Sequence, residues 1–508
     1  MGALWTSAGG AARKLSDRLF PTGGGPQAAA IHPWSLDRPL LRFAGQDAWT
    51  IRDACAGTLI FGDTGSGKTT GSGQAIAMAM LRAGFGGLVL TVKAGETDRW
   101  REYARRCGRE NDLIVFSPER PHRFNFLEYE YRRSTRGGGS TENIVELFVT
   151  VMNASSASQG SASNEAYWDR ALRQLLRNML DALRLAGDPL TLSNMRSLLV
   201  SAPMAREQVS DPEWRRDSYL FRTLERASDR SSTESGQHTL RLTADYWLSE
   251  FAETMDPRTR GNIVSTFTTT VDGFMRGDLH ELFGTSLNIT PELTLDGKII
   301  VLDLPEKQFH DLGRTAQLVW KLCWQRAVEE SERDQRSRPV MLWADEAQRF
   351  VTVKEPGFVQ TVREHKGCCV YLTQARSNYL HAMGPGNQAA VESFLGVPKT
   401  KIFHCNGDPE TNEWAQRIIS EDWRTRASYN LAEPDGRTPR VRDADSKRST
   451  GFSRSREPRI HASVFGILGC GGPPDFVVQA ILFQSGRRFA AGEGNTIRLS
   501  FSQGDPSR

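Results

Sequence analysis

The sequence predicts an α/β fold: a mainly parallel β-sheet core that carries an inserted all-α domain. Short apolar runs recur along the chain, and they are continuous rather than alternating, which is typical of strands buried on both faces of a parallel sheet. Helical patterns lie between several of these runs. One long stretch, residues 117–297, has helical periodicity but no comparable strand pattern. Together these observations predict a sheet interrupted by a helical insertion.

The first part of the core is expected to follow an N-terminal arm. Residues 1–40 are rich in glycine, proline and alanine, and they predict a flexible arm. Residues 41–139 are predicted to form the first part of the core, with short strands near 41–45 and 49–51 and a helix at 73–84. Its buried strands are expected at 57–62, 87–92 and 113–116.

Residues 140–290 are predicted to form the inserted, mostly helical domain. Gly/Ser-rich breaks separate its helices, which are expected at 142–153, 165–187, 192–202 and 238–255. The core then resumes over residues 291–423, with a long helix at 313–330. Its buried strands are expected at 298–304, 340–344, 368–373 and 401–405.

The C-terminal part begins with an unusual composition. Residues 424–459 contain ten Lys/Arg against five Asp/Glu and few bulky apolar residues. They predict a flexible, solvent-exposed basic segment, with a basic flap that touches phosphates as the alternative. Residues 460–508 are expected to supply closing strands at 476–484 and 496–503, followed by a tail.

Composition excludes several classes of protein. Lys and Arg number 64 against 60 Asp and Glu, and the resulting net charge of +4 is too small to indicate a nucleic-acid partner by itself. No apolar run approaches the roughly 18 residues of a membrane-spanning helix. The seven cysteines form no CxxC pair, which disfavours a zinc ribbon and fits a reducing cytoplasm. We therefore expect a cytoplasmic location without a transmembrane helix.

The strongest motif is GDTGSGKT, residues 62–69, which fits GxxxxGK[ST] and stands between a strand pattern and a helix pattern. Its glycines allow successive backbone N–H groups to surround phosphate oxygens, and the following helix directs its positive end at them. Lys68 is expected to reach the β- and γ-phosphates, and the Thr69 hydroxyl to bind Mg²⁺. ATP and Mg²⁺ are thus the predicted cofactors, and the nucleotide-binding candidates are Gly62, Thr64, Gly65, Ser66, Gly67, Lys68, Thr69 and Thr70.

A P-loop needs an acidic partner at the end of a neighbouring strand. Asp345 and Glu346 follow the apolar run 340–344, so Asp345 is the candidate Mg²⁺ ligand and Glu346 the candidate general base. The paired acids favour hydrolysis over nucleotide holding alone. The rival acid is Asp303, which ends another strand but is followed by Leu304 rather than by a second acid.

Gln374 ends the next apolar strand, and the interval from Asp345 to Gln374 fits strand–helix–strand. A polar residue there, beside the acid-bearing strand, can sense the γ-phosphate or orient the attacking water. We therefore count Gln374 as a candidate catalytic residue, with a strand-end side chain satisfied by solvent as the alternative.

The ordered motifs resemble those of the type IV secretion (conjugative) coupling proteins, the VirD4/TraG/TraD group, within the FtsK–HerA class of P-loop motor ATPases. The P-loop and the acid pair are generic, but their order together with TQARS and NGDPET is more specific. The matching stretches are FGDTGSGKTT (61–70), VKAGE (92–96), FSPERPHRFNFLE (116–128), residues 249–274, DGKIIVLDLPE (296–306), WADEAQRF (343–350), YLTQARS (371–377) and residues 401–418.

The resemblance implies a RecA-like P-loop core, an inserted all-α domain, a ring of six subunits and ATP-driven movement of DNA toward a secretion channel. The resemblance also implies roles for single residues. Gly65, Gly67, Lys68 and Thr69 would bind nucleotide, Asp345 and Glu346 would form the acid motif, and Gln374 would be the sensor. The chain departs from the family in two places. The family's N-terminal membrane helices are absent, and Phe126 stands where the family has proline.

Three functions remain open at this point. The first is a DNA-translocating ATPase of the coupling type, with sequence-independent DNA, a relaxase or other nucleoprotein substrate and secretion-channel subunits as partners. Partners of that kind could hold the protein at the inner membrane. The second is a HerA/FtsK-like motor for DNA processing or defence, and the third is a nucleotide-switched scaffold or substrate receptor. The intact Glu346 argues against the third.

Ring motors often complete each ATP site with an arginine from the neighbouring subunit. Two arginines are the main candidates: Arg376, which follows the sensor, and Arg260. Arg258 is a weaker third. We expect Arg376 to act in this way because it lies at the carboxyl edge of the predicted sheet.

Overall fold

The structure is a computed structural model that describes residues 32–43, 45–133, 139–156, 162–431 and 448–503. The arm predicted for residues 1–40 therefore lies outside the described residues up to residue 31. Residues 32–38 form turns, and a two-stranded antiparallel sheet of β1 (Pro39–Arg42) and β2 (Ala48–Thr50) follows.

A nine-stranded sheet forms the centre of the core, with the strand order β13-β12-β9-β3-β8-β7-β4-β6-β5. The seven strands from β9 to β5 are parallel, whereas β12 and β13 add to one edge in antiparallel fashion. The predicted α/β class with a mainly parallel sheet is confirmed. The strands are β3 (Thr58–Phe61), β4 (Gly86–Leu90), β5 (Leu113–Phe116), β6 (Ile299–Leu302), β7 (Val340–Ala344), β8 (Gly367–Thr373), β9 (Thr400–Phe403), β12 (Val477–Gln484) and β13 (Thr496–Ser502).

Both faces of this sheet are buried, which explains why its strands are continuous apolar runs. Successive side chains of β3 point to opposite faces, so Leu59 and Phe61 join one hydrophobic core and Ile60 joins the other. The helices divide between the two faces in the same way. One face carries α2 (Ile51–Cys55), α3 (Gln74–Arg82) and α4 (Glu96–Arg106); the other carries α15 (Glu306–Glu330), α16 (Glu355–Thr361), α17 (Arg376–Met383), α18 (Gln388–Gly396) and α19 (Pro409–Ile419).

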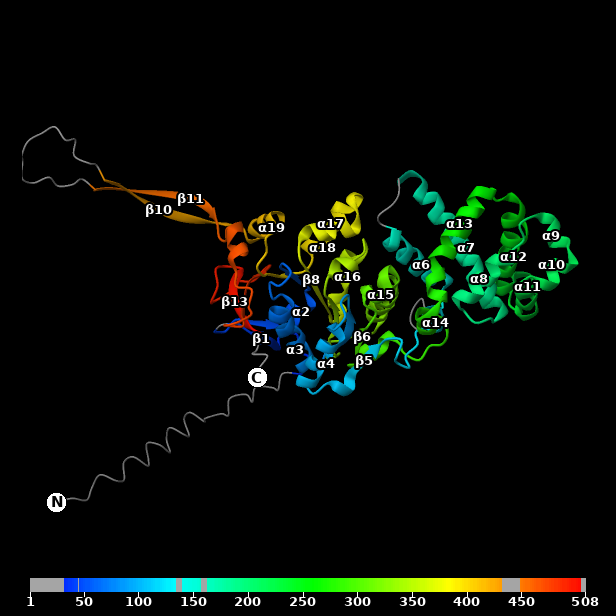
Figure 1. The fold of residues 1–508 in the computed structure, drawn as a ribbon, viewed down its shortest axis with the longest axis horizontal. Helices are drawn as coiled ribbons and strands as arrows, with labels where there is room; N and C mark the ends of the chain where they lie inside the picture. The colour runs from blue at the N-terminus through cyan, green and yellow to red at the C-terminus, as the bar shows by residue number, and fades with distance from the viewer. Residues whose placement is uncertain (1–31, 44, 134–138, 157–161, 432–447, 504–508) are drawn as a thin grey trace, which may run out of the picture.

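The chain between β5 and β6 is helical and lies at one end of the molecule (Figure 1). It leaves and re-enters the core at one place, because Phe124 pairs with Leu287 in an antiparallel bridge. Phe126, at the position where the family has proline, starts the first helix and is buried. The helices are α5 (Phe126–Arg132), α6 (Thr141–Ser156), α7 (Ala162–Ala186), α8 (Leu192–Val200), α9 (Arg206–Ser210), α10 (Pro212–Asp217), α11 (Tyr219–Arg230), α12 (Glu234–Asp245), a π-helical turn (Tyr246–Thr254), α13 (Pro257–Asp272) and α14 (Gly277–Gly284).

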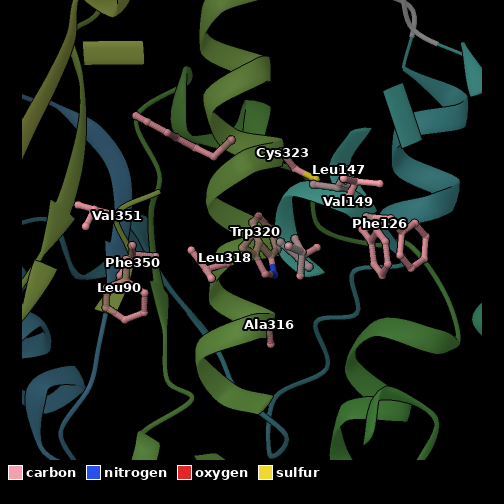
Figure 2. Close-up of a cluster of buried hydrophobic side chains, with 14 of the residues drawn as sticks. Leu90, Phe126, Leu147, Val149, Ala316, Leu318, Trp320, Cys323, Phe350 and Val351 are labelled. Carbon is pink, nitrogen blue, oxygen red and sulfur yellow. The ribbon is translucent and has the colours of Figure 1, made fainter. Parts of the chain in front are cut away.

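Helix α15 joins the helical region to the sheet. Figure 2 shows Ala316, Leu318, Trp320 and Cys323 along this helix, between the sheet-side residue Leu90 and residues of α5 and α6. Trp320 is fully buried and stacks on Phe124, with 3.9 Å between ring centroids. A single hydrophobic core therefore runs from the sheet into the helical region, which ties the two parts together.

Residues 424–431 and 448–458 form strands, whereas a flexible segment was predicted for 424–459. Strands β10 (Glu421–Leu431) and β11 (Arg448–Pro458) pair over their whole length as an antiparallel hairpin, and residues 432–447 lie outside the described part. The prediction missed the hairpin because a strand exposed on both faces buries neither set of side chains, so it has no period-two alternation of apolar and polar residues. Figure 1 shows the hairpin extending from the body at the end opposite the helical region.

Among the described residues, no helix combines the length and apolar character needed to cross a bilayer.

Candidate nucleotide-binding and hydrolysis site

The P-loop lies between the end of β3 and the helix that leads into α3. Gly65 and Gly67 both have φ of +79°, a backbone conformation that favours glycine. A Cβ on Gly67 would stand only 2.4 Å from a methyl of Val478 on β12, so this glycine also permits close packing. Thr69–Gly73 form a π-helical turn that continues directly into α3, and the loop therefore ends at a helix N-terminus.

Several polar groups of the loop lack a partner of their own. Lys68 is buried, and its ammonium forms no hydrogen bond or ion pair with any residue that the structure describes. The buried Ser66 hydroxyl also has no hydrogen-bond partner. Thr64 and Gly65 are exposed at the mouth of the loop, whereas the Thr70 hydroxyl accepts a 2.7 Å hydrogen bond from Gln503. An unpaired buried cation and hydroxyl fit a phosphate group, because buried polar groups are normally satisfied.

The structure brings together the two residues predicted to bind Mg²⁺. The Thr69 hydroxyl donates a 2.8 Å hydrogen bond to Oδ2 of Asp345, although 276 positions separate them in the chain. Oδ1 of Asp345 accepts from the backbone N–H of Glu346 at 3.0 Å. A hydroxyl and a carboxylate at this separation are oxygen donors of the kind that Mg²⁺ prefers.

The strand order corrects the expectation that the acid-bearing strand is the neighbour of the P-loop strand. The acid-bearing β7 is not the immediate neighbour of β3, because β8, which leads to Gln374, lies between them. Asp303, the rival acid, follows β6, and β4 separates β6 from β7. Burial raises the pKa of Asp303. The site therefore gathers Asp345 and Glu346 and leaves Asp303 out.

Glu346 is held by three side chains. Its Oε1 forms a 2.8 Å ion pair with Lys93, and its Oε2 accepts from Gln348 at 3.0 Å. The amide of Gln374 lies 3.4 Å from Oε1. Burial acts to raise the pKa of Glu346, but the hydrogen bonds from Lys93 and Gln348 and the charge of Lys68 bring the pKa below its ordinary value. The candidate base is thus kept ionised, and its backbone is in the left-handed region at φ +51°.

Lys93 and Glu96 belong to the site, although the sequence analysis did not count them as site residues. Glu96 is buried, and its Oε2 accepts the backbone N–H groups of Val92 and Lys93 at 2.8 and 3.2 Å. Burial and the charge of Asp345 raise the pKa of Glu96 to about 7. Glu96 therefore fixes the loop that presents Lys93 to Glu346. The sequence feature that could have identified these two residues is the VKAGE stretch, residues 92–96. It follows a buried strand and therefore lies at the carboxyl edge of the sheet.

The NGDPET turn packs against the P-loop and the candidate sensor. The Asp63 carboxylate accepts the N–H of Gly407 at 2.7 Å, and Asn406 donates to the carbonyl of Gln374 at 2.8 Å. Asp408 caps α19 by accepting the N–H of Thr411. The turn thus connects the phosphate-binding loop to the end of β8.

The three candidate arginines have different surroundings. Arg376 forms an ion pair with Glu392, and its side chain is 13% exposed. Arg260 is buried inside the helical region, where its guanidinium donates to the carbonyl of Phe251 at 2.7 Å. Arg258 is exposed at the first turn of α13. Arg376 must therefore leave Glu392 before it can reach another subunit, and Arg260 is committed to the helical region.

Comparisons with known proteins give a match in structure only. No family model matches the chain, and no curated protein matches its sequence. The unbound bacterial conjugative coupling protein TrwB superposes with a TM-score of 0.60 at 14% identity, over 94% of this chain and 91% of that one. TrwB in complex with the ATP analogue ADPNP gives 0.58 at 14% identity, over 94% of both chains. TrwB in complex with ADP and Mg²⁺ gives 0.58 at 13% identity, over 94% of this chain and 92% of that one.

These matches extend through both the sheet core and the helical region, since they cover almost the whole chain. The chain has the fold of the conjugative coupling protein TrwB, and the resemblance to the type IV secretion coupling proteins is confirmed at the level of the fold.

Proposed function

We propose that this protein is an ATP-hydrolysing DNA translocase of the conjugative coupling type. One observation carries the proposal: Thr69, Asp345 and Glu346 converge at the carboxyl edge of one parallel sheet, with Lys68 unpaired beside them. That set contains a phosphate-binding loop, a metal-binding pair and an ionised base. A protein that only held nucleotide would not need the base.

The loop residues 62–70 are proposed to bind the phosphates of ATP. The backbone N–H groups around Gly65 and Gly67 face the phosphate oxygens, and Lys68 offsets the negative charge of the β- and γ-phosphates. Thr69 and Asp345 are the proposed Mg²⁺ ligands, and a bound Mg²⁺ would neutralise part of the negative charge of the phosphates. The coupling protein TrwB, whose fold this chain shares, has been observed with ADP and Mg²⁺ and with ATP and GTP analogues, which supports this assignment.

Glu346 is proposed to accept the proton of the attacking water. Lys93 and Gln348 hold its carboxylate, and Gln374 lies within reach of the same oxygens. This arrangement supports a role for Gln374 in orienting the water or sensing the γ-phosphate. Because Gln374 and the P-loop both contact the NGDPET turn, a change at one can reach the other through Asn406 and Asp63.

DNA of any sequence is the proposed substrate, and the active form is proposed to be a ring of six subunits. A motor has to hold each sequence that it meets, so phosphates rather than base edges are the expected contacts. A relaxase or another nucleoprotein and the subunits of a secretion channel are the proposed further partners. The fold shared with a conjugative coupling protein supports this choice over a DNA-processing motor without a channel.

The direct test is ATP turnover measured with and without DNA. We expect DNA to stimulate the wild-type protein, Lys68→Ala to abolish turnover, and Glu346→Gln to bind ATP without cleaving it. Lys307→Met, on an exposed part of α15, serves as the control and should behave as wild type. Turnover of Glu346→Gln at the wild-type rate would show that the base is another residue.

DNA binding should also weaken steeply as salt rises from about 50 to about 200 mM, because phosphate contacts release counterions. If the wild-type protein binds ATP without turnover, with or without DNA, it is a nucleotide-switched scaffold and the proposal is wrong.

A further inference from the structure

Among the described residues, no helix or sheet covers the hairpin of β10 and β11 beyond its base (Figure 1). It joins the body at its base, where the N–H of Arg459 donates to the carbonyl of Ser420 at 3.2 Å. Beyond that base it extends away from the sheet and its helices (Figure 1). Two-stranded hairpins are only marginally stable in water on their own. A hairpin of eleven paired positions is therefore a strong candidate for contact with a partner.

The two faces of the hairpin differ in charge. Residues directly opposite each other in an antiparallel pair share a face, and alternate pairs share the same face. One face, here called the Trp423 face, consists beyond the first pair of Trp423, Thr425, Ala427, Phe452, Arg454 and Arg456. The other, here called the Glu457 face, consists of Asp422, Arg424, Arg426, Ser453, Ser455 and Glu457.

Carboxylates balance the arginines on the Glu457 face but not on the Trp423 face. Arg426 forms a 2.7 Å ion pair with Glu457, whose pKa the charge of Arg424 also lowers, and Asp422 on the same face pairs with Arg459 at 3.6 Å. Arg454 and Arg456 form no ion pair within the part of the chain that the structure describes. The nearest carboxylate on their own face, Glu421, lies at the base of the hairpin.

The Trp423 face also has exposed aromatic rings. The guanidinium carbons of Arg454 and Arg456 lie 5.5 and 5.3 Å from the centre of the Trp423 ring, which holds both groups at the surface. Trp423 is 51% exposed, and Phe452 farther along the face is 74% exposed. Positioned arginines interleaved with aromatic side chains are typical of nucleic-acid contacts.

The distribution of charge along the chain also favours a negatively charged partner for the hairpin. Residues 424–459 contain ten Lys/Arg and five Asp/Glu, whereas the complete chain has a net charge of only +4. The excess positive charge of this protein is therefore concentrated in the segment that contains most of the hairpin, and the rest of the chain is slightly acidic. A segment with this excess of positive charge attracts a polyanion through long-range electrostatics.

We propose that the Trp423 face of the hairpin binds the phosphodiester backbone of DNA, with Arg454 and Arg456 as the phosphate contacts. This inference rests on the proposed function, because it places part of the DNA grip outside the nucleotide-binding core and the helical region. The hairpin then acts as an arm that engages the DNA away from the ATP site.

Two double variants of the full chain separate the two faces. R454A/R456A removes two positive charges from the Trp423 face, and R424A/R426A removes the same number from the Glu457 face. Binding is measured by fluorescence anisotropy with labelled single-stranded and duplex DNA of unrelated sequences, over a series of salt concentrations. Thermal unfolding of both variants checks that they are folded.

We expect R454A/R456A to weaken duplex binding by about tenfold or more and to lower the slope of log K against log salt by about 2, or somewhat less for single strands. R424A/R426A should change the affinity by less than about twofold, because Arg426 is paired with Glu457 and the charge of Arg424 also acts on that carboxylate. R454K/R456K should keep most of the affinity, since a phosphate contact needs the charge.

The outcomes distinguish this inference from the proposed function. The inference is wrong, and the proposed function stands, if the wild type binds DNA and R454A/R456A binds it equally well. The same holds if R454A/R456A and R424A/R426A lose DNA affinity to the same extent. If the wild type binds no DNA at low salt, the proposed function itself fails. If sedimentation shows that R454A/R456A assembles less well while its DNA affinity is unchanged, the partner of the hairpin is a second copy of the chain, which also overturns the inference.

Discussion

At the scale of single residues, the most informative contact is the ion pair between Lys93 and Glu346. The Lys93 side chain is 60% exposed, while that of Glu346 is 7% exposed, so one end of the pair reaches solvent and the other lies in the site. We therefore propose that Lys93 is a positioning residue, which orients the buried carboxylate of Glu346. The contact brings the loop after β4 into the candidate site.

Replacing Lys93 with methionine tests that role. We expect Lys93→Met to lower kcat about tenfold or more and to leave KM for ATP nearly unchanged, because the base loses its orientation while the P-loop is intact. Steady-state kinetics of both parameters measure the effect, with Lys307→Met as a control that removes an exposed lysine. A rise in KM with unchanged kcat would instead make Lys93 a nucleotide contact.

Lys401 gives a prediction on pH. It is buried in β9, and burial lowers the pKa of its ammonium to about 8. Below that pH the folded protein holds a buried charge, whereas the unfolded chain keeps a pKa of about 10.4. The resulting destabilisation is therefore fully present below about pH 8 and disappears as the pH rises toward 10.4.

Lys401→Met should accordingly stabilise the protein at pH 7, by on the order of 1–2 kcal/mol after the loss of the hydrogen bond to the Pro398 carbonyl. The gain should shrink or reverse at pH 10. Chemical unfolding at the two pH values measures it, and the exposed Lys399→Met is the matched control. An equal gain at both pH values would contradict the assignment of the cost to the buried charge.

At the scale of elements, the turn at residues 406–411 connects the parts of the site. Its Asp408 accepts the N–H of Thr411 at 3.0 Å, and the Thr411 hydroxyl in turn accepts the N–H of Arg376 at 2.9 Å. The cap of α19 therefore also holds the start of α17. The turn therefore links the start of α19 to the start of α17, beside the candidate sensor.

Asp408→Ala should lower the free energy of unfolding by about 1 kcal/mol, the usual cost of a lost N-cap. It should also reduce DNA-stimulated ATP turnover, because the segment after Gln374 loses its anchor. Asp408→Asn keeps a capping oxygen and should restore most of both properties. Thermal unfolding and ATPase assays on the two variants make the measurement; normal turnover in a destabilised Asp408→Ala protein would limit the turn to a structural role.

At the scale of the whole molecule, the sheet core lies between two projecting parts, the helical region and the hairpin (Figure 1). The candidate ATP site lies at the edge of the sheet, and its proposed completion by a neighbour's arginine depends on assembly. Arg376 must exchange its ion pair with Glu392 for that role, whereas Arg258 is already exposed. Assembly and the state of Arg376 are therefore expected to change together.

If Arg376 acts in trans, specific ATPase activity should rise with protein concentration as rings form. Mixing Arg376→Ala with Lys68→Ala subunits should restore part of the activity, because a mixed interface pairs an intact P-loop with an intact arginine. The parallel mixture with Arg258→Ala serves as the comparison. Activity per subunit that does not depend on concentration would exclude the shared site, and failure of the Arg376 mixture alone would exclude only Arg376.

Much of the fold was predictable because the physical requirements are local. A strand buried on both faces needs a continuous apolar run, and the runs at 340–344 and 368–373 coincide with β7 and β8. The P-loop has a fixed pattern because phosphate binding requires glycine at positions such as Gly65 and Gly67. The hairpin was missed because a strand without a buried face has no hydrophobic pattern to read.

The sequence by itself determined the α/β class, the phosphate-binding loop and the acidic pair, since each depends on residues that are close together in the chain. Only the tertiary structure decided that β8 lies between the P-loop strand and the acid-bearing strand, and that Lys93 meets Glu346 across 253 positions. The physical reason is that contacts between distant segments depend on how the crossover helices pack the strands side by side, and local patterns carry no record of that order.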